Sequence, residues 1–231
     1  MLKNTLINRL ATKKVALALG DLNDQVVYVG GATVSLYIDD PAAEDIRPTK
    51  DIDLTFQIAT YAKLEQLRED LVARGFYQSA EDAVTCRFRY DDLLIDVMTT
   101  QTVGWAPSNP WFEKGFDKAI TIDLNNVVIK VLPLPYFLAT KMEAFYDRGI
   151  KDVYASHDLE DLVYLFNYTT AIDTHVLASN KEVQLYLAEK LISITENHTI
   201  MSAIRGSLYY EQADERMEII KERFQNIING I

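Results

Sequence analysis

Hydrophobic residues recur in two different patterns along this chain, and the pattern changes near Pro133. Before Pro133, short apolar runs are separated by turn residues, which is typical of β-strands. After Pro133, apolar residues recur every three or four positions over long stretches, which is typical of amphipathic helices. The sequence therefore predicts an α+β fold, with a sheet flanked by helices over residues 1–133 and a helical domain over residues 134–231.

The pattern also predicts the individual elements. In the first region, strands are predicted at residues 26–29, 51–56, 76–77, 85–90, 93–98, 120–124 and 127–132, and helices at 3–19, 32–38 and 61–74. Residues 101–118 contain two prolines and several polar residues, so a long loop is predicted there. In the second region, helices are predicted at 135–148, 157–167, 181–196 and 207–229.

Two glycines follow the first predicted strand. Gly30 and Gly31 end the run at 26–29 and lead into a predicted helix. A strand that ends in glycines before a helix N-terminus lets backbone N–H groups approach an anion, which the helix dipole also favours. A Gly-Gly pair after a strand is most often only a turn, so the pair needs support from other residues.

Carboxylates in two later strands provide that support. Asp51 and Asp53 are two residues apart in a predicted strand, so their side chains share one face. Adjacent carboxylates repel each other, and such a pair is usually retained where a cation lies between them, although a solvated strand edge is the alternative. Asp96 lies inside the apolar run at 93–98, which we expect to be buried on both faces. A buried carboxylate is costly unless it is paired or bound to a metal.

The predicted helices after Pro133 carry a second group of charged residues between Lys141 and Asp161. From periodicity alone, these would be solvated helix faces with ion pairs one turn apart, each contributing about 0.3–0.5 kcal/mol.

The combination of these motifs resembles a known superfamily. Gly30-Gly31, a helix and then Arg47-x-Thr49-x-Asp51-Ile52-Asp53 is similar to the signature of nucleotidyltransferases related to DNA polymerase beta, and especially to the AbiEii-type toxin nucleotidyltransferases. That superfamily has a third carboxylate on a neighbouring strand, which Asp96 matches. The AbiEii pattern K-x-x-A-x-x-x-R…K-D…(R/H)-D-L-x-D-L is matched in order by Lys141, Ala144, Arg148, Lys151 and Asp158. The interval between Lys151 and Asp158 is longer than this pattern leads us to expect, and the resemblance covers residues 26–162.

The resemblance implies a nucleotidyltransferase-type mixed sheet and a Mg²⁺-dependent transfer of a nucleoside monophosphate from an NTP to a hydroxyl group. Asp51, Asp53 and Asp96 would be the ligands of a two-metal site, and Asp96 would also take the proton of the attacking hydroxyl. Gly30 and Gly31 would hold the phosphates. The triphosphate would be positioned by Arg47, Thr49 and Lys141, with Asp158 in support.

Composition bears on the acceptor. The net charge is −11, which argues against broad binding of nucleic acid without a local basic surface. The residues that could form such a surface are Lys13, Lys14, Lys63, Arg68, Arg74, Arg87, Arg89, Lys114 and Lys118. The toxin branch favours tRNA as acceptor and implies a cognate antitoxin as partner. Transfer to a protein or to a small molecule of the antibiotic type, and a non-catalytic, antitoxin-like nucleotide-binding module, remain alternatives.

Cysteine and histidine contribute little. One cysteine, Cys86, excludes an internal disulfide and a cysteine-based zinc cluster, and the three histidines lack zinc-ligand spacing. The apolar runs are too short to span a bilayer, and the N-terminus lacks the features of a signal peptide. We therefore expect a cytoplasmic protein without a membrane segment.

Overall fold

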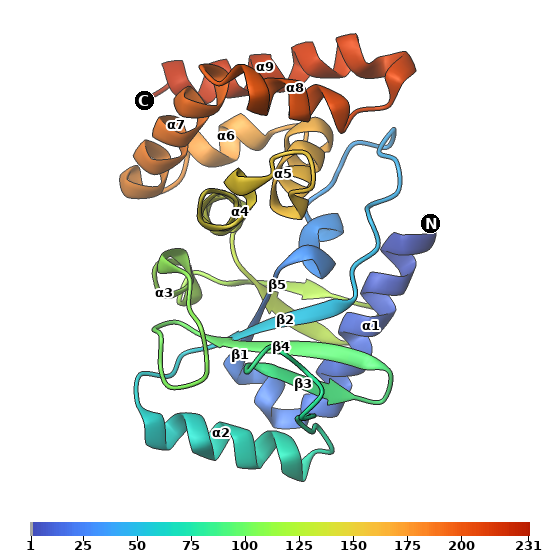
Figure 1. Ribbon diagram of the computed structural model, residues 1–231, viewed down its shortest axis with the longest axis vertical. Coiled ribbons are helices and arrows are strands. Elements are labelled where there is room, and N and C mark those ends of the chain that lie inside the picture. The colour runs from blue at the N-terminus through green and yellow to red at the C-terminus, as the bar shows by residue number, and fades with distance from the viewer. Residues whose placement is uncertain (1) are drawn as a thin grey trace. The chain divides into compact units, whose positions relative to one another are not determined.

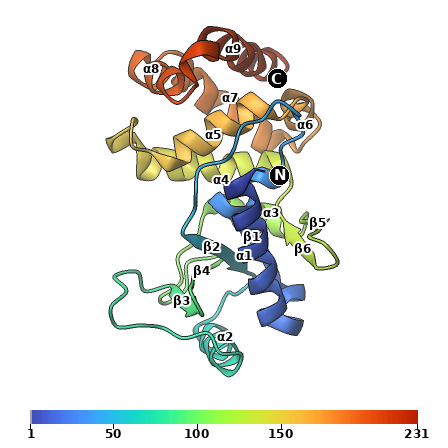
Figure 2. The ribbon, with the colours of Figure 1, turned by 90° about the vertical axis from the view of Figure 1, so that its right-hand side faces the viewer.

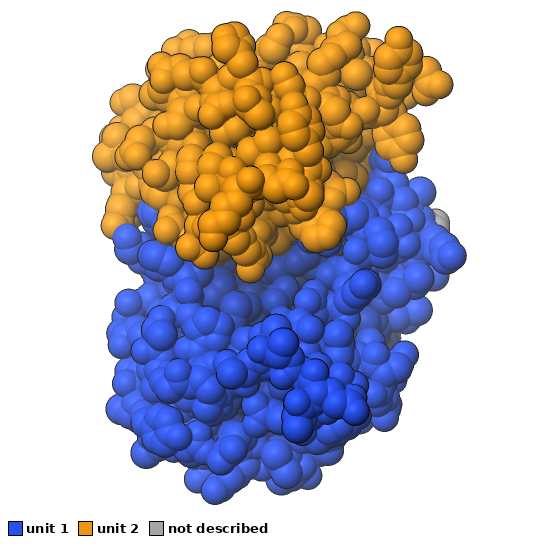
Figure 3. Space-filling model, viewed as in Figure 1, with its two compact units in different colours: residues 1–35, 44–133 blue, residues 36–43, 134–231 orange. Residues whose placement is uncertain are grey.

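A computed structural model describes residues 2–231, and the chain divides into two compact units (Figure 3). Unit 1 contains the residues up to Ser35 together with Glu44–Pro133. Unit 2 contains Leu36–Ala43 and Leu134–Ile231. The short segment Leu36–Ala43 thus packs with the helical unit, although it connects two strands of unit 1.

Unit 1 is built on a mixed six-stranded sheet (Figure 1). Its strands are β1 (Val26–Val29), β2 (Asp51–Phe56), β3 (Arg87–Tyr90), β4 (Leu93–Thr99), β5 (Ile120–Asp123) and β6 (Val128–Val131), in the spatial order β3-β4-β2-β1-β6-β5. The pairs β2–β4 and β1–β6 are parallel, and the other three pairs are antiparallel. The predicted α+β class with a mixed sheet is confirmed.

The apolar pattern explains which strands lie in the core. All four residues of β1 are buried, as expected for a central strand whose side chains are covered on both faces. In β4, by contrast, buried and partly exposed residues alternate. The expectation that Asp96 lies in a strand buried on both faces is therefore wrong, because one face of β4 is left partly open. The strand predicted at 76–77 is reduced to an isolated bridge between Tyr77 and Arg89.

The helices of unit 1 are α1 (Lys3–Leu19), α2 (Tyr61–Ala73) and α3 (Pro110–Phe116), with 3₁₀ helices η1 (Gly20–Gln25) and η2 (Gly31–Leu36). The helix α1 ends at Gly20, whose positive φ of 58° suits glycine. The segment after the glycines is a 3₁₀ helix and not the predicted α-helix. The loop predicted at 101–118 contains α3, because Asn109 caps its N-terminus by accepting from Trp111 N and Pro110 takes the first helical position.

Unit 2 is helical (Figures 1 and 2). Its elements are α4 (Leu134–Asp147), η3 (Gly149–Lys151), α5 (His157–Tyr168), α6 (Ile172–Leu177), α7 (Lys181–Thr195), α8 (His198–Gly206), η4 (Tyr210–Gln212) and α9 (Ala213–Asn229). The helix predicted at 207–229 begins later, at Ala213, and α6 and α8 were not predicted. Asn197 starts α8 by accepting hydrogen bonds from Thr199 N and Ile200 N.

The core of unit 2 is formed mainly by aromatic and aliphatic side chains of α4, α5, α7 and α9, such as the perpendicular rings of Phe166 and Phe224. Among the residues that the structure describes, no helix is both long enough and apolar enough to cross a membrane.

Candidate active site

Three aspartates share one face of the sheet in unit 1. Asp51 and Asp53 are two residues apart on β2, and Asp53 is in register with Asp96 on the parallel strand β4. Residues in register on neighbouring strands point to the same side of the sheet, so all three carboxylates lie on that side. The sheet register therefore assembles the three residues that the sequence selected as metal ligands.

Gly30 packs directly against one of these aspartates. It follows Val29, which is the antiparallel partner of Asp53. A β-carbon placed on Gly30 would overlap the carboxylate of Asp53, and the φ of Gly30 is +73°. Both the space and the backbone conformation therefore require glycine at this position.

The remaining residues of the signature also lie together. A β-carbon on Gly31 would lie 2.7 Å from Arg47 Nη2 and 3.3 Å from Thr49 Oγ1. Thr49 Oγ1 in turn donates a hydrogen bond of 3.1 Å to Asp51 Oδ1. The glycines, Arg47, Thr49 and the aspartates thus form one continuous group within unit 1.

Arg87 joins two of the three carboxylates. It lies on β3, opposite Asp96 in the antiparallel register. Its Nε and Nη2 donate to the two oxygens of Asp96, each over 2.7 Å, and Nη2 also lies 3.2 Å from Asp51 Oδ2. The hydrogen bonds to Asp96 are the main cause of the raised pKa of the Arg87 guanidinium.

Sequence reasoning placed Arg87 in a surface patch and missed this role. The strands predicted at 85–90 and 93–98, which only Asp91 and Asp92 separate, contained the necessary signal, because two strands joined this closely form an antiparallel hairpin. Once Tyr90 pairs with Leu93, the strict alternation of an antiparallel ladder brings Arg87 opposite Asp96.

Other residues of the predicted basic surface are also paired with carboxylates. Several of its members contact carboxylates, namely Lys14 with Asp91 and Asp92, Arg68 with Glu65, Arg74 with Asp21 and Arg89 with Asp82. Their charge is balanced locally, so they do not amount to a concentrated positive surface.

The three aspartates have the chemistry of magnesium ligands, but their present arrangement is not that of a metal site. In the part of the chain that the structure describes, no three acidic, histidine or cysteine side chains are arranged so that they could hold a metal ion as they stand. The donor set nevertheless suits Mg²⁺, which prefers carboxylate oxygens. The presence of a guanidinium between Asp51 and Asp96 shows that a positive charge is accommodated there.

Cys86 is next to Arg87 in sequence but is not a candidate ligand or nucleophile. Burial, and secondarily the charge of Asp96, raise the pKa of the Cys86 thiol to about 11. The thiol is therefore protonated at neutral pH, whereas the thiolate is the reactive and metal-binding form.

The second group of sequence-selected residues lies in unit 2. Lys141 on α4 reaches two carboxylates of α5, with Nζ 2.7 Å from Asp161 Oδ2 and 3.4 Å from Asp158 Oδ1. Arg148 donates to Asp158 through Nε over 2.8 Å and through Nη2 over 3.2 Å. Lys151 is exposed in η3. The family residues Lys141, Arg148 and Asp158 are thus brought together.

Lys141, Asp158 and Asp161 are buried, which corrects the expectation of solvated helix faces for these residues, whereas 69% of the Arg148 side chain is exposed. Only 7% of the Lys141 side chain and 1% of the Asp161 side chain are exposed. Burial alone would raise the pKa of Asp158, but Lys141 and Arg148 outweigh it and lower that pKa. The ionised carboxylate of Asp158 therefore stabilises the fold above its ordinary pKa of 3.8, and this contribution is lost as the pH falls below that value.

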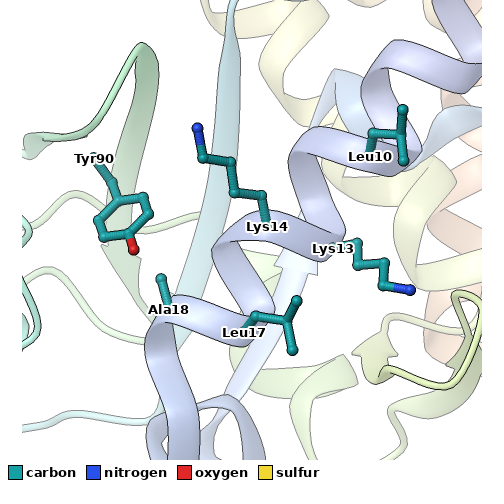
Figure 4. Close-up of a pocket in the computed structure, with 6 residues that line it drawn as sticks. All are labelled: Leu10, Lys13, Lys14, Leu17, Ala18 and Tyr90. Atoms are coloured by element: carbon teal, nitrogen blue, oxygen red, sulfur yellow. The ribbon is translucent and has the colours of Figure 1, made fainter.

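A shallow pocket of about 390 Å³ lies elsewhere on unit 1 (Figure 4). It is lined by Leu10, Lys13, Lys14, Leu17, Ala18 and Tyr90. Lys13 and Lys14 leave α1 in different directions, and the lining includes none of the residues selected from the signature.

Comparison with known proteins finds a matching family model and a similar solved structure. The model of a family described as "Nucleotidyl transferase AbiEii toxin, Type IV TA system" matches residues 15–231, including the helices that carried no recognised motif. Among solved structures, the chain is similar to an antigenic nucleotidyltransferase-like protein from Paracoccidioides brasiliensis, with 16% identity and a TM-score of 0.49 over 84% of this chain and 91% of that one. A search of the curated proteins gave no match.

Replacement of Gly30 by alanine should destabilise unit 1. The added β-carbon would overlap the Asp53 carboxylate at a backbone with positive φ, so we expect Gly30→Ala to lower the free energy of unfolding by about 2 kcal/mol. Urea denaturation measures this loss. Gly206→Ala is the matched control, because its β-carbon would meet no atom within 4 Å, and it should unfold like the parent or at slightly higher urea. Equal midpoints for both variants would contradict the packing described here.

Replacement of Lys141 by methionine should destabilise unit 2. The change removes the ammonium group that Asp158 and Asp161 both contact, and breaking a buried ion pair costs about 3 kcal/mol or more. Lys151→Met provides the control, since Lys151 is exposed and should change the midpoint of urea denaturation little. A Lys141 variant as stable as the Lys151 variant would show that the buried pairs contribute nothing.

Proposed function

The chain belongs to the AbiEii family of nucleotidyl transferase toxins, and from that premise we propose that it transfers a nucleoside monophosphate from an NTP to a hydroxyl group of tRNA in a Mg²⁺-dependent reaction. The observation that supports this most strongly is the common face of Asp51, Asp53 and Asp96 beside Gly30. Transfer of a nucleoside monophosphate from an NTP to tRNA needs several metal ligands close to a turn that binds phosphate.

The nucleotide would be held mainly through its phosphates. Gly30 and Gly31 would offer backbone N–H groups to the phosphates, and the absence of side chains there lets Asp53 and Arg47 pack against the turn. Arg47 and Thr49 line the same turn, and an arginine fork suits phosphate oxygens. The resemblance assigns Lys141 to the triphosphate, with Asp158 in support; within unit 2 the ammonium group of Lys141 is paired with Asp158 and Asp161.

Asp51, Asp53 and Asp96 would hold the Mg²⁺ ions. When bound, the ions would supply positive charge against the negative charge that develops on the departing pyrophosphate. A carboxylate oxygen of Asp96 would accept the proton of the acceptor hydroxyl. Asp53 packs against Gly30, which follows the antiparallel partner of Asp53, Val29.

The acceptor is the least constrained part of this proposal. The toxin branch of the resemblance favours tRNA, whereas the net charge of −11 and the local ion pairs of the basic residues do not favour a large nucleic-acid surface. A protein or a small molecule with a free hydroxyl would need the same metal ligands. The family description also implies a cognate antitoxin as a partner in the cell.

Transfer of label from α-labelled NTPs tests the proposal. We expect the protein with Mg²⁺ to move label from one of the four NTPs into bulk tRNA, and Asp53→Asn to reduce that transfer at least about 100-fold, because it removes a ligand charge at the reacting phosphates. Asp82→Asn is the control: Asp82 pairs with Arg89 and carries no proposed role, so its transfer should equal the parent's.

The pattern of labelling separates the alternatives. Label on a protein or small molecule in cell lysate, but not on RNA, would retain the chemistry and replace the acceptor. NTP-dependent thermal stabilisation without any pyrophosphate would favour the nucleotide-binding module. An active Asp53→Asn variant would contradict the assignment of the site.

A further inference from the structure

Arg87 is a charged group at the three aspartates for which neither the resemblance nor the proposed reaction provides a role. We propose that, in the metal-free protein, its guanidinium takes the place of a metal cation between Asp51 and Asp96, so that Arg87 pairing and divalent-metal binding compete for the same carboxylates. This inference rests on the proposed function, because it assumes that these carboxylates are metal ligands.

The geometry makes the competition direct. The fork of Arg87 uses both oxygens of Asp96, at 2.7 Å each, and reaches Asp51 Oδ2 at 3.2 Å. A magnesium ion requires near-octahedral oxygen ligands at about 2.1 Å. A guanidinium hydrogen-bonded to both oxygens of Asp96 already uses a lone pair on each of them, and its positive charge would repel the metal ion at the same carboxylate.

Burial strengthens the pair. About 18% of the Arg87 side chain is exposed, compared with 16% for Asp96 and 32% for Asp51. Charges that are partly removed from water interact more strongly than those at an open surface. A bidentate arginine pair is also among the stronger hydrogen-bonded arrangements in proteins. Metal binding must therefore overcome a substantial interaction at Asp96.

A second pair on the same strand provides an internal comparison. Arg89 donates to both oxygens of Asp82, at 2.8 Å each, which is nearly the same bidentate geometry. The two arginines bind different carboxylates: the bidentate hydrogen bonds join Arg89 to Asp82 and Arg87 to Asp96. Loss of Arg89 thus removes a similar ion pair from β3 without exposing the three aspartates.

Titration with Mn²⁺, followed by the EPR signal of the free ion and without nucleotide, tests the competition. We expect Arg87→Gln to bind Mn²⁺ about tenfold more tightly than the parent, because hydrogen bonds to charged groups contribute on this scale and the competing charge is gone. Arg89→Gln should bind Mn²⁺ like the parent. Adding Asp96→Asn to Arg87→Gln should abolish the gain.

A lysine variant distinguishes competition from a purely structural role. Arg87→Lys keeps the charge but lacks the fork, so its Mn²⁺ affinity should lie between those of the parent and Arg87→Gln. If Arg87 only supported the fold, both variants would melt at lower temperature and bind Mn²⁺ no more tightly than the parent. The lysine variant also serves if Arg87→Gln fails to fold.

The possible failures point to different errors. If the parent binds Mn²⁺ and transfers label but Arg87→Gln binds Mn²⁺ equally or more weakly, the competition is wrong and the proposed function stands. If neither the parent nor the variants bind Mn²⁺, with or without an NTP, and no label moves, the metal site itself is wrong and both proposals fall.

Discussion

Repulsion among three carboxylates on one face of a sheet is the constraint on which unit 1 depends. Asp51, Asp53 and Asp96 are brought together by backbone register, which hydrophobic burial on the other side of β2 and β4 enforces. The sheet cannot relieve the repulsion by slipping one residue, because that would turn Ile52 and Leu54 out of the core. The charges must therefore be compensated where they are, and in this structure Arg87 and Thr49 provide part of that compensation.

Much of this site could be predicted from sequence because its determinants are local. The period of two on β2 fixes the common face of Asp51 and Asp53. A glycine directly after a strand, as at Gly30, indicates a tight turn with positive φ. The burial of β4 was overestimated, because an apolar run does not reveal which neighbours cover each face. The partner of Arg87 was missed for a related reason: it depends on strand register, which composition and charge counting do not include.

The helical unit shows the same limit in a different form. Helical spacing placed α4, α5 and α7 within a residue or two, but it could not tell a solvated charged face from a buried one. Lys141, Asp158 and Asp161 have the composition of a surface, yet they meet between two helices, and their charges balance once Arg148 is included. The helix predicted at residues 207–229 begins only at Ala213, after the 3₁₀ helix Tyr210–Gln212, and α8 is a separate helix that Asn197 caps; such local signals are obscured by a long amphipathic pattern.

The strongly acidic composition and an anionic substrate are compatible if positive charge is supplied close to the site. At physiological ionic strength, charges more than about 8 Å apart in solvent are largely screened, so a net charge of −11 mainly affects the encounter with a polyanion. Within the site, the signs of the nearest groups decide. The carboxylates there would repel a triphosphate unless cations accompany it, whereas Arg47 lies beside the glycine turn, where its guanidinium would suit phosphate oxygens under the proposed function. If the proposed function holds, such an arrangement would make nucleotide binding depend on metal binding, and Arg87 would set how readily the metal binds.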